Sequence, residues 1–207
     1  MVKAEIPAAE LARHVALARP RAPVLVTSLN PDGTINVAPF SWNTPISVEP
    51  PLFLLALQER PRQSDTLRNL ENGGQFVTNF PGLDLARQLV ASSYEHAPGV
   101  NKFSAAGFTP LPSRVVRVPG IAECRAHLEC DVIEVLRPAG GDHALVVGRV
   151  VAACYDPSAW TEDGAPRLEP VPPVVHLGQR RDEGGQTHLF LRPAGAMEVF
   201  VPYVERR

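Results

Sequence analysis

Two alternating apolar segments separated by a turn form the clearest local pattern in this chain. Residues 24–40 alternate on either side of Asn30-Pro31-Asp32-Gly33, in which Pro31 pre-sets the turn and Gly33 can adopt a positive φ. A hairpin is therefore predicted. The alternation stops at Pro39, a residue that a central strand does not favour, and aromatic and small polar residues follow it.

Longer apolar patterns predict further strands. Residues 52–58 and 144–155 are apolar on both faces, which is typical of central strands, and Gly148 breaks the second of them. Residues 121–136 alternate between apolar even-numbered and polar odd-numbered positions, until the apolar set shifts by one position after Val132. Such a shift predicts a bulge or a bend at a barrel corner. The strands predicted outside the hairpin are residues 52–58, 75–80, 121–136 and 144–155.

Short helical patterns lie between the strands. The second of three helices would be capped by Ser64 or Asp65, would bury Leu67 and Leu70, and would end at Gly73. Many strands without regular strand–helix alternation favour an antiparallel barrel or sandwich. No boundary divides the chain, so we expect one domain over residues 1–207, with a core at about 20–155 and a C-terminal excursion over 156–207. The predicted helices cover residues 8–18, 64–73 and 83–93.

Composition and charge exclude several classes of protein. A formal net charge of -2 over 207 residues argues against a nucleic-acid partner, because such proteins concentrate positive charge. The N-terminal segment lacks the apolar region of a signal peptide, and no apolar run approaches the ~20 residues that span a bilayer. Three cysteines without a C-x-x-C pair do not form a disulfide framework. We therefore expect a cytoplasmic protein without a membrane partner.

The common catalytic motifs are absent from the sequence: it contains no G-x-G-x-x-G, Walker, H-E-x-x-H or G-x-S-x-G pattern. Cys124 and Cys130 fall on an apolar strand face, and Cys154 ends an apolar strand, so all three are interpreted as buried small hydrophobic residues rather than nucleophiles or metal ligands. His127 is expected to be structural or solvent-facing. His176 lies in a predicted loop with glycine and arginine, where either a ligand contact or a structural role is possible.

Two stretches could form one binding site. The first is residues 39–44, where the hairpin pattern ends. The second is residues 58–66, where a strand ends near Arg60 and Arg62 and a helix begins. Hydroxyl groups, a helix N-terminus and guanidinium groups all favour a phosphate. An ordinary helix cap beside two solvated arginines explains this second stretch equally well.

Four segments in the same order resemble the flavin-reductase-like family of FMN-binding split barrels, which includes flavoredoxins and the reductase components of two-component monooxygenases. The resemblance covers residues 20–155 and has a weaker echo at "VVHLGQRR". The family's "APFS-aromatic-N…S…PP" pattern is matched at residues 38–51. Its "DT-x-x-N" pattern is matched from Asp65 to Asn69, and its "PGV-x-x-F" pattern from Pro98 to Phe103.

The resemblance implies a mainly β (α+β) fold, a six-stranded antiparallel split β-barrel with short flanking helices, and a homodimer with FMN near the subunit interface. It implies that residues 39–44 line the isoalloxazine ring and that residues 60–66 hold the ribityl phosphate. Trp42 could instead be a rim or interface aromatic, and Phe103 a core residue. The candidate cofactor-binding residues are Pro39, Phe40, Ser41, Trp42, Asn43, Thr44, Arg60, Arg62, Ser64, Asp65, Thr66, Phe103 and His176, with no catalytic or metal-ligating residue.

Two departures from the family pattern affect the expected chemistry. Ser64 replaces a basic residue that many relatives carry before the "DT" pair, so Arg60 or Arg62 would supply the charge. The late "R-L-G-G-x-x-Y-A" pattern is altered at His176 and beyond, which leaves the electron donor open. The resemblance implies an FMN-binding flavoprotein that transfers hydride from NADH or NADPH. Its alternatives are a non-enzymatic flavin carrier with an electron-accepting protein partner and a cofactor-free barrel.

Overall fold

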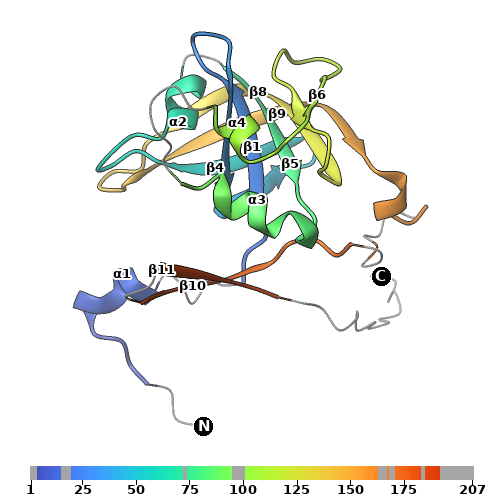
Figure 1. Cartoon of the computed structure of the whole chain (residues 1–207). Coiled ribbons are helices and arrows are strands. Elements are labelled where there is room, and N and C mark those ends of the chain that lie inside the picture. Colours follow the sequence, from blue (N-terminus) through green and yellow to red (C-terminus); the bar gives the residue numbers. More distant parts are fainter. Residues whose placement is uncertain are drawn as a thin grey trace, which may run out of the picture.

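The fold is a curled antiparallel sheet with short helices around it (Figure 1). A computed structural model describes residues 4–14, 20–71, 74–94, 101–162, 167, 171–182 and 185–191. Within these residues, seven strands form one sheet in the order β2-β1-β5-β8-β9-β4-β3. They are β1 (Val24–Leu29), β2 (Ile35–Phe40), β3 (Asn43–Ser47), β4 (Leu52–Gln58), β5 (Gln75–Phe80), β8 (Ala126–Leu136) and β9 (His143–Tyr155).

The order of the strands explains why the sheet curls. Its two edge strands, β2 and β3, are consecutive in the chain and are joined only by Ser41 and Trp42. A two-residue link cannot cross a flat seven-stranded sheet, so the edges must approach each other. Asn43 Nδ2 donates to the Phe40 carbonyl over 2.9 Å, and Ala56 N donates to the Trp42 carbonyl over 2.9 Å, which ties this corner to β4.

The predicted hairpin is confirmed, whereas the strand count of six is wrong. β1 and β2 pair in continuous register from Val24–Phe40 to Leu29–Ile35, and Gly33 in the turn has a φ of 83°. The seventh strand is β3, which the sequence does not reveal because most of its side chains are exposed and it contains a proline. Pro39 lies inside β2 because β2 is an edge strand, where a missing N–H is tolerated.

Short helices and small strand pairs complete the fold. The predicted helix at 64–73 is observed as α2, and Ser64 is its cap, since the Ser64 hydroxyl accepts a hydrogen bond from Leu67 N. The predicted helix at 8–18 is described only up to His14, and Gly73 lies outside the described residues. The remaining elements are η1 (Ala8–Glu10), α1 (Leu11–His14), α2 (Asp65–Leu70), η3 (Leu83–Leu85), α3 (Ala86–Ala91), α4 (Lys102–Ala105), β6 (Pro110–Leu111), β7 (Gly120–Ile121), η4 (Pro157–Ala159), β10 (His176–Asp182) and β11 (Gly185–Phe190).

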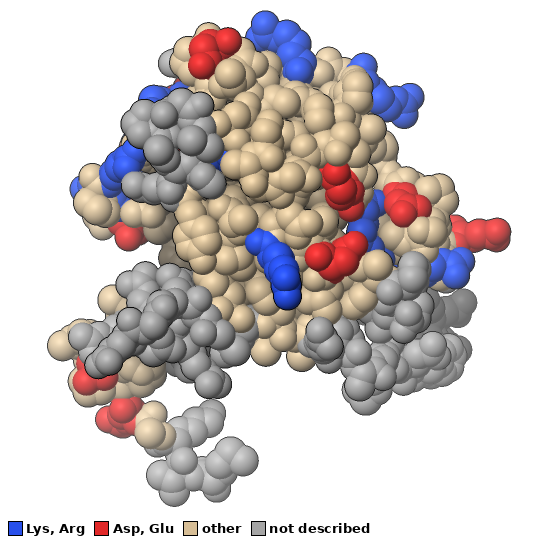
Figure 2. Space-filling model, viewed as in Figure 1, with Lys and Arg blue, Asp and Glu red and all other residues tan. Residues whose placement is uncertain are grey.

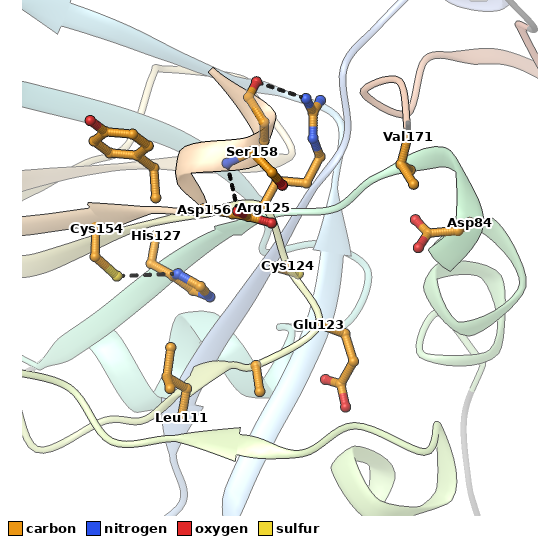
Figure 3. Close-up of a pocket in the computed structure, with 13 residues that line it drawn as sticks. Asp84, Leu111, Glu123, Cys124, Arg125, His127, Cys154, Asp156, Ser158 and Val171 are labelled. Atoms are coloured by element: carbon orange, nitrogen blue, oxygen red, sulfur yellow. Dashed lines mark hydrogen bonds between the residues drawn. The ribbon is translucent and has the colours of Figure 1, made fainter. Parts of the chain in front are cut away.

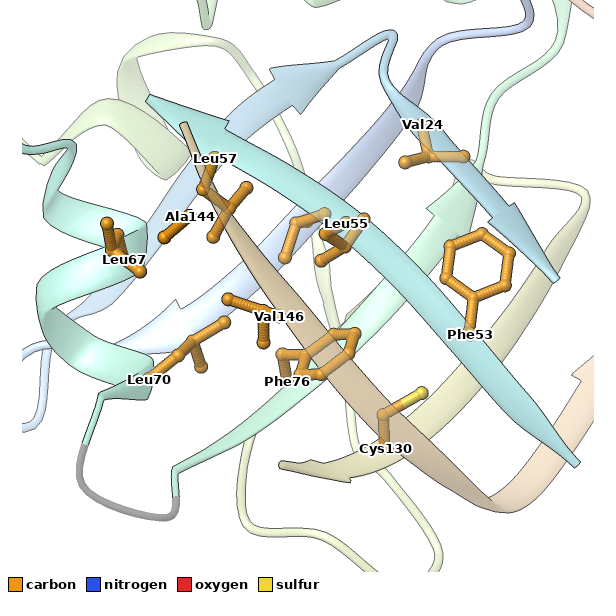
Figure 4. Close-up of a cluster of buried hydrophobic side chains, with 11 residues drawn as sticks. Val24, Phe53, Leu55, Leu57, Leu67, Leu70, Phe76, Cys130, Ala144 and Val146 are labelled. Atoms are coloured by element: carbon orange, nitrogen blue, oxygen red, sulfur yellow. The ribbon is translucent and has the colours of Figure 1, made fainter. Parts of the chain in front are cut away.

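The interior of the curled sheet holds the larger core (Figure 4). Phe53, Leu55 and Leu57 from β4 and Phe76 from β5 pack there against the inward leucines of α2. Gly148 does not break β9, as the sequence suggested, because the strand continues through it with unbroken pairing to β4. The glycine instead makes room for the Phe76 ring: a Cβ atom at this position would lie 2.5 Å from Phe76 Cζ.

A second core lies under the helices that flank β1 and β2. Leu25 and Val37 from the hairpin pack there against Leu85, Leu89 and Phe103. Phe103 is only 2% exposed, and its ring lies 5.7 Å from the Phe108 ring, measured between centroids. Phe103 is therefore a core residue in this structure.

The strand predicted over 121–136 begins later, at Ala126. Residues 122–125 form a turn, closed by a hydrogen bond from Cys124 N to the Ile121 carbonyl. The predicted bulge is confirmed, because the register shifts between Val132 and Glu134. The odd-numbered polar face is not solvent-facing at its start, where His127 and Glu129 are 5% and 3% exposed. The loop over residues 114–116 covers Glu129, and His127 lies against Gly120 and Ile121.

Glu129 anchors that loop. Its carboxylate accepts hydrogen bonds from the backbone N–H groups of Arg114, Val115 and Val116 over 2.8, 2.7 and 3.1 Å. Burial raises the pKa of Glu129, but the three N–H donors stabilise its charged form more strongly, and the pKa is lowered from its ordinary value of 4.5.

Glu129→Gln should lower the free energy of unfolding by about 1.5–3 kcal/mol at neutral pH, since it removes the charge that strengthens these hydrogen bonds. A lowered folded-state pKa contributes stability that is fully present above the ordinary value of 4.5 and is lost as the pH falls through the folded-state value. Urea unfolding of both proteins at pH 7 and well below pH 4.5 measures the difference. An equal difference at both pH values would contradict the role of the charge.

The C-terminal excursion contains more regular structure than its composition suggests. His176 begins strand β10 rather than lying in a loop, and β10 pairs with β11 as a separate two-stranded ribbon. The ribbon runs below the barrel in Figure 1, and Phe190 of β11 packs against the second core. A bridge between Arg21 and His176 joins the ribbon to the chain just before β1.

Charge on the molecular surface is mixed. Figure 2 shows acidic and basic side chains interspersed on the visible face, without one sign covering it. In the part of the chain that the structure describes, no helix has the length and apolarity to cross a membrane.

Candidate functional site

A cavity of about 360 Å³ lies where the end of β2 meets the loop before α2. This volume is within the range of ~300–1,000 Å³ that is typical of small-molecule sites. Seven residues of its wall are uncharged and come from β2, β4 and the segment directly after α3. The lining residues are Asn36, Ala38, Pro39, Phe40, Gln58, Arg62, Gln63, Ser64, Asp65, Thr66, Ser92, Ser93 and Lys102.

Hydroxyl groups and cations meet in this cavity, which suits an anion. Ser64 and Thr66 come from α2 and its cap. Ser92 and Ser93 follow α3, but their hydroxyls donate to the backbone carbonyls of Leu89 and Val90. Arg62 and Lys102 contribute positive charge from two separate segments. Because α2 has only six residues, the side chains, rather than a helix dipole, must supply most of the electrostatic attraction.

Asp65 is the carboxylate of the cavity, and two cations lie close to it. Its Oδ1 atom is 3.2 Å from Arg68 Nη1, and its Oδ2 atom is 3.7 Å from Lys102 Nζ. These pairs offset the negative charge of Asp65 and tie α2 to α4. The two cations that line the cavity, Arg62 and Lys102, outnumber this one carboxylate, so the cavity favours a negatively charged group.

A second hollow of about 270 Å³ adjoins the first, because both are lined by Pro39 and Ser93. It is more apolar, and two imidazole rings form part of its wall: His188 Nδ1 lies 3.4 Å from His176 Nε2. Burial lowers the pKa of His188, which favours its neutral form. The lining residues are Pro23, Pro39, Ser41, Leu89, Val90, Ser93, Tyr94, His176 and His188.

The structure brings eight of the thirteen predicted site residues to these two hollows. Pro39 lines both of them, and the sequence separation between the members reaches 137 residues, from Pro39 to His176. Six of the eight line the first hollow, and the second hollow adds Ser41 and His176. The six are Pro39, Phe40, Arg62, Ser64, Asp65 and Thr66.

The other predicted residues lie elsewhere. The Trp42 ring stacks on His143 at a centroid distance of 4.6 Å, and the Arg21 guanidinium carbon lies 5.3 Å from the Trp42 centroid. Asn43 binds backbone carbonyls at the corner between β2 and β3, and the Thr44 hydroxyl bonds the Pro45 carbonyl. Phe103 is in the core, as described above.

The two candidate arginines are separated by the structure. Arg60 is exposed, and its guanidinium donates to the Gly141 carbonyl in the loop before β9. Arg62 lines the first cavity. Of the two, Arg62 is therefore the one positioned to contact a ligand there.

Lys102 and Asn36 are cavity residues that the sequence reasoning missed. Lys102 stands next to Phe103 in the "PGV-x-x-F" segment, so the positive charge within that motif was the signal that could have revealed it as a cavity residue. Residues 95–100 of the same region lie outside the described part of the chain. Asn36 is an inward polar residue in an apolar strand and is only 4% exposed. A buried amide in a strand needs partners, which is itself a sign of a polar network.

A further cavity of about 360 Å³ lies where β8 begins and β9 ends (Figure 3). None of the predicted site residues line it. His127 and Cys154 line it. His127 Nε2 lies 2.7 Å from the Ile121 carbonyl, so Nε2 carries the proton and Nδ1 accepts from the Cys154 thiol over 3.4 Å.

Neither member of this pair is activated. Burial lowers the pKa of His127 and raises the pKa of Cys154, so both are neutral at physiological pH. Cys124 and Cys130 are buried, as predicted, and burial raises the pKa of Cys130 to about 12. Cys154 differs from the prediction because it is only half-buried. The first cavity, with its cations and hydroxyls, is the stronger candidate site.

Comparison with known proteins identifies the family of the chain. The model of the flavin reductase like domain matches residues 17–183. The chain belongs to the flavin reductase like domain family. The curled mainly β sheet is thus the split-barrel fold of flavoproteins in this family.

Members of the family and similar structures cover nearly the whole chain. An uncharacterised protein of Halalkalibacterium halodurans is 33% identical over 182 residues, which are 84% of this chain and 86% of that protein. Nitrilotriacetate monooxygenase component B from Bacillus cereus has a TM-score of 0.80 at 23% identity, covering 95% and 100% of the two chains. An FMN-binding protein from Thermus thermophilus, solved with 1-cyclohex-2-enone, has a TM-score of 0.71 at 23% identity and covers 98% of each.

Proposed function

We propose that this protein binds FMN and acts as an NAD(P)H-dependent flavin reductase. The observation that carries the proposal is the junction of two hollows at Pro39 and Ser93, one lined by cations and hydroxyls and the other mainly apolar. FMN has the same two parts, a phosphate and a planar ring system. Family membership supports a flavin as the cofactor.

The residues present fit a terminal phosphate. Arg62 and Lys102 would supply charge, and the hydroxyls of Ser64 and Thr66 would donate hydrogen bonds to phosphate oxygens. Thr66 is suited to this role because its hydroxyl accepts a hydrogen bond from Asn36 and donates none to a described atom, so its proton remains for a ligand. The binding experiment must also compare FMN with FAD, which carries a second phosphate and a nucleoside.

The second hollow fits a planar ring with a polar edge. Pro39, Leu89 and Tyr94 would provide apolar contact, while Ser41 and His176 would offer hydrogen bonds at the rim. Among the described residues, the buried Nε2 atom of His188 has no hydrogen-bond partner, which is the kind of group that a ligand can satisfy.

The chemistry of the proposed reaction belongs to the bound flavin, which would accept hydride from NADH or NADPH and pass electrons to an acceptor. The side chains of the first hollow would anchor the phosphate, and those of the second would orient the ring and exclude water. No side chain is required as an acid or a base, which is consistent with the neutral state of His188. No catalytic residue is therefore proposed.

The visible spectrum tests this function. Purified protein mixed with FMN should turn yellow, retain the colour through gel filtration, and bleach rapidly when NADH or NADPH is added without oxygen. Retained FMN that bleaches slowly would favour the second candidate, a flavin carrier that works with an electron-accepting protein. Failure to take up any flavin would contradict both functions.

We also propose that the working form is a homodimer. Phe53, Leu55 and Leu57 of β4 point into the core, so Leu52 and Leu54 lie on its other face, where they are only half-buried. An apolar outer sheet face is typically covered by another subunit. Sedimentation of the FMN-bound protein at micromolar concentration should show a dimer, and a stable monomer would exclude a site built from two chains.

A further inference from the structure

A chain of hydrogen bonds runs from the exposed β1–β2 turn to the first cavity, and its last two bonds, both made by Asn36, are buried. It begins at the Asp32 carboxylate and passes through Thr34, Asn30, Asn69, Ser28 and Asn36 to the Thr66 hydroxyl. Six hydrogen bonds of 2.6–3.2 Å connect these seven side chains. Asn69 belongs to the "DT-x-x-N" motif but does not line the cavity, so direct ligand contact does not explain it.

The start of this network has a fixed direction. A carboxylate accepts and does not donate, so the Thr34 hydroxyl donates its single proton to Asp32 over 2.6 Å. This bond lowers the pKa of Asp32, which keeps the carboxylate ionised. Thr34 Oγ1 must then accept from Asn30 Nδ2, and the other side of that amide, Oδ1, accepts from Asn69 Nδ2 over 3.0 Å.

Between Asn69 and the cavity the two asparagine amides are the donors, and the Ser28 hydroxyl accepts from both of them. Asn69 Nδ2 gives its second proton to Ser28 Oγ over 3.0 Å, and Asn36 Nδ2 donates to Ser28 Oγ over 3.2 Å. The second proton of Asn36 Nδ2 goes to Thr66 Oγ1 over 2.9 Å. Thr66 is 1% exposed and yet lines the cavity, so its hydroxyl is held as an acceptor from behind while its own proton is left for the cavity.

We infer that Asn36, supported by Asn69 and Ser28, is a positioning residue that makes Thr66 a preorganised donor for the phosphate of the ligand. The inference rests on the proposed function, because it names the part of the site that distinguishes FMN from riboflavin. An amide is required at residue 36, since a group that only accepts would draw the Thr66 proton away from the cavity.

Titration of FMN and riboflavin against wild-type protein, Asn36→Ala and Asn36→Asp measures the effect. Asn36→Ala should lower the preference for FMN over riboflavin by about fivefold, and the nearly isosteric Asn36→Asp by tenfold or more, since a carboxylate both reverses the Thr66 hydroxyl and repels a phosphate. Riboflavin affinity should stay within about twofold in both variants, which also reports that the ring site is folded.

A double-mutant cycle separates positioning from a general effect on the site. In a Thr66→Val background, Asn36→Ala should no longer change the ratio of FMN to riboflavin affinity. Gln75→Ala is the matched control, because Gln75 is an amide on β5 that bonds Asp131 and Arg117 N away from the cavity. It should leave the ratio unchanged.

The outcomes distinguish this inference from the function on which it rests. Wild-type protein that binds no flavin would overturn the proposed function. Wild-type preference for FMN that survives Asn36→Ala and Asn36→Asp would overturn the inference alone. Equal losses of both ligands in these variants, or an undiminished effect of Asn36→Ala in the Thr66→Val background, would also overturn it.

Discussion

Replacing Thr66 by alanine should weaken FMN binding about tenfold to a hundredfold and change riboflavin binding by no more than about twofold. The hydroxyl of Thr66 is buried, lines the cation-rich cavity, and has its acceptor side occupied by Asn36. A hydrogen bond from it to a phosphate would join a neutral donor to a charged acceptor, an interaction worth roughly 1.5–3 kcal/mol. Riboflavin lacks the phosphate and therefore loses nothing at this point.

The two neighbouring arginines provide a matched comparison for the same experiment. Arg62→Ala should reduce the preference for FMN over riboflavin, because Arg62 lines the cavity. Arg60→Ala should not, because its guanidinium bonds the Gly141 carbonyl outside the cavity. Equal loss of both flavins in Thr66→Ala would show that the residue acts through the stability of α2, and absence of a wild-type preference would exclude a phosphate clamp.

Gly148→Ala should destabilise the protein by about 1–3 kcal/mol, although alanine is otherwise acceptable in a strand. A Cβ atom at this position would lie 2.5 and 2.7 Å from two atoms of the Phe76 ring and 3.1 Å from Cys130 Cβ. Phe76 is fully buried among the residues of the larger core, so its ring cannot move aside without displacing them. Urea unfolding should show a lower midpoint with an unchanged slope.

A compensating change tests this explanation. Phe76→Leu alone should also destabilise, but the double variant should lose less than the sum of the two single changes, by about 0.5–3 kcal/mol. Ala153→Val is a suitable control, because it adds bulk to the same strand at an exposed position and should stay within about 0.5 kcal/mol of wild type. Strictly additive losses would mean that contact with Phe76 is not the cause.

Local sequence determined the elements that local interactions hold together. The hairpin of residues 24–40 was predictable because proline and glycine dictate the turn and alternation sets its register. The α2 helix was predictable from its serine cap and two inward leucines, and the bulge after Val132 from a shift in alternation. The family motifs also carried the fold, because four ordered segments are specific even where each motif is short.

Tertiary structure decided what depends on contacts between distant segments. The sheet has a seventh strand because the two-residue link after β2 brings the chain to β4, and β3 itself has no apolar alternation to reveal it. Gly148 looked like a strand breaker, whereas its meaning depends on a phenylalanine 72 residues earlier in the chain. The polar strand face that carries Glu129 gave no sign of its burial, because the loop that covers this carboxylate comes from residues 114–116.

The candidate site shows the same division. Residue types alone fitted a phosphate-binding region before α2 and an ordinary helix cap equally well, since hydroxyls and arginines were close together in sequence. Only the fold separated Arg62 from Arg60, brought Lys102 and Asn36 to the same cavity, and moved Trp42 onto His143. The physical reason is that a strand or a capped helix is set by neighbours in sequence, whereas the direction of a side chain at a cavity is set by whatever packs against it from elsewhere in the fold.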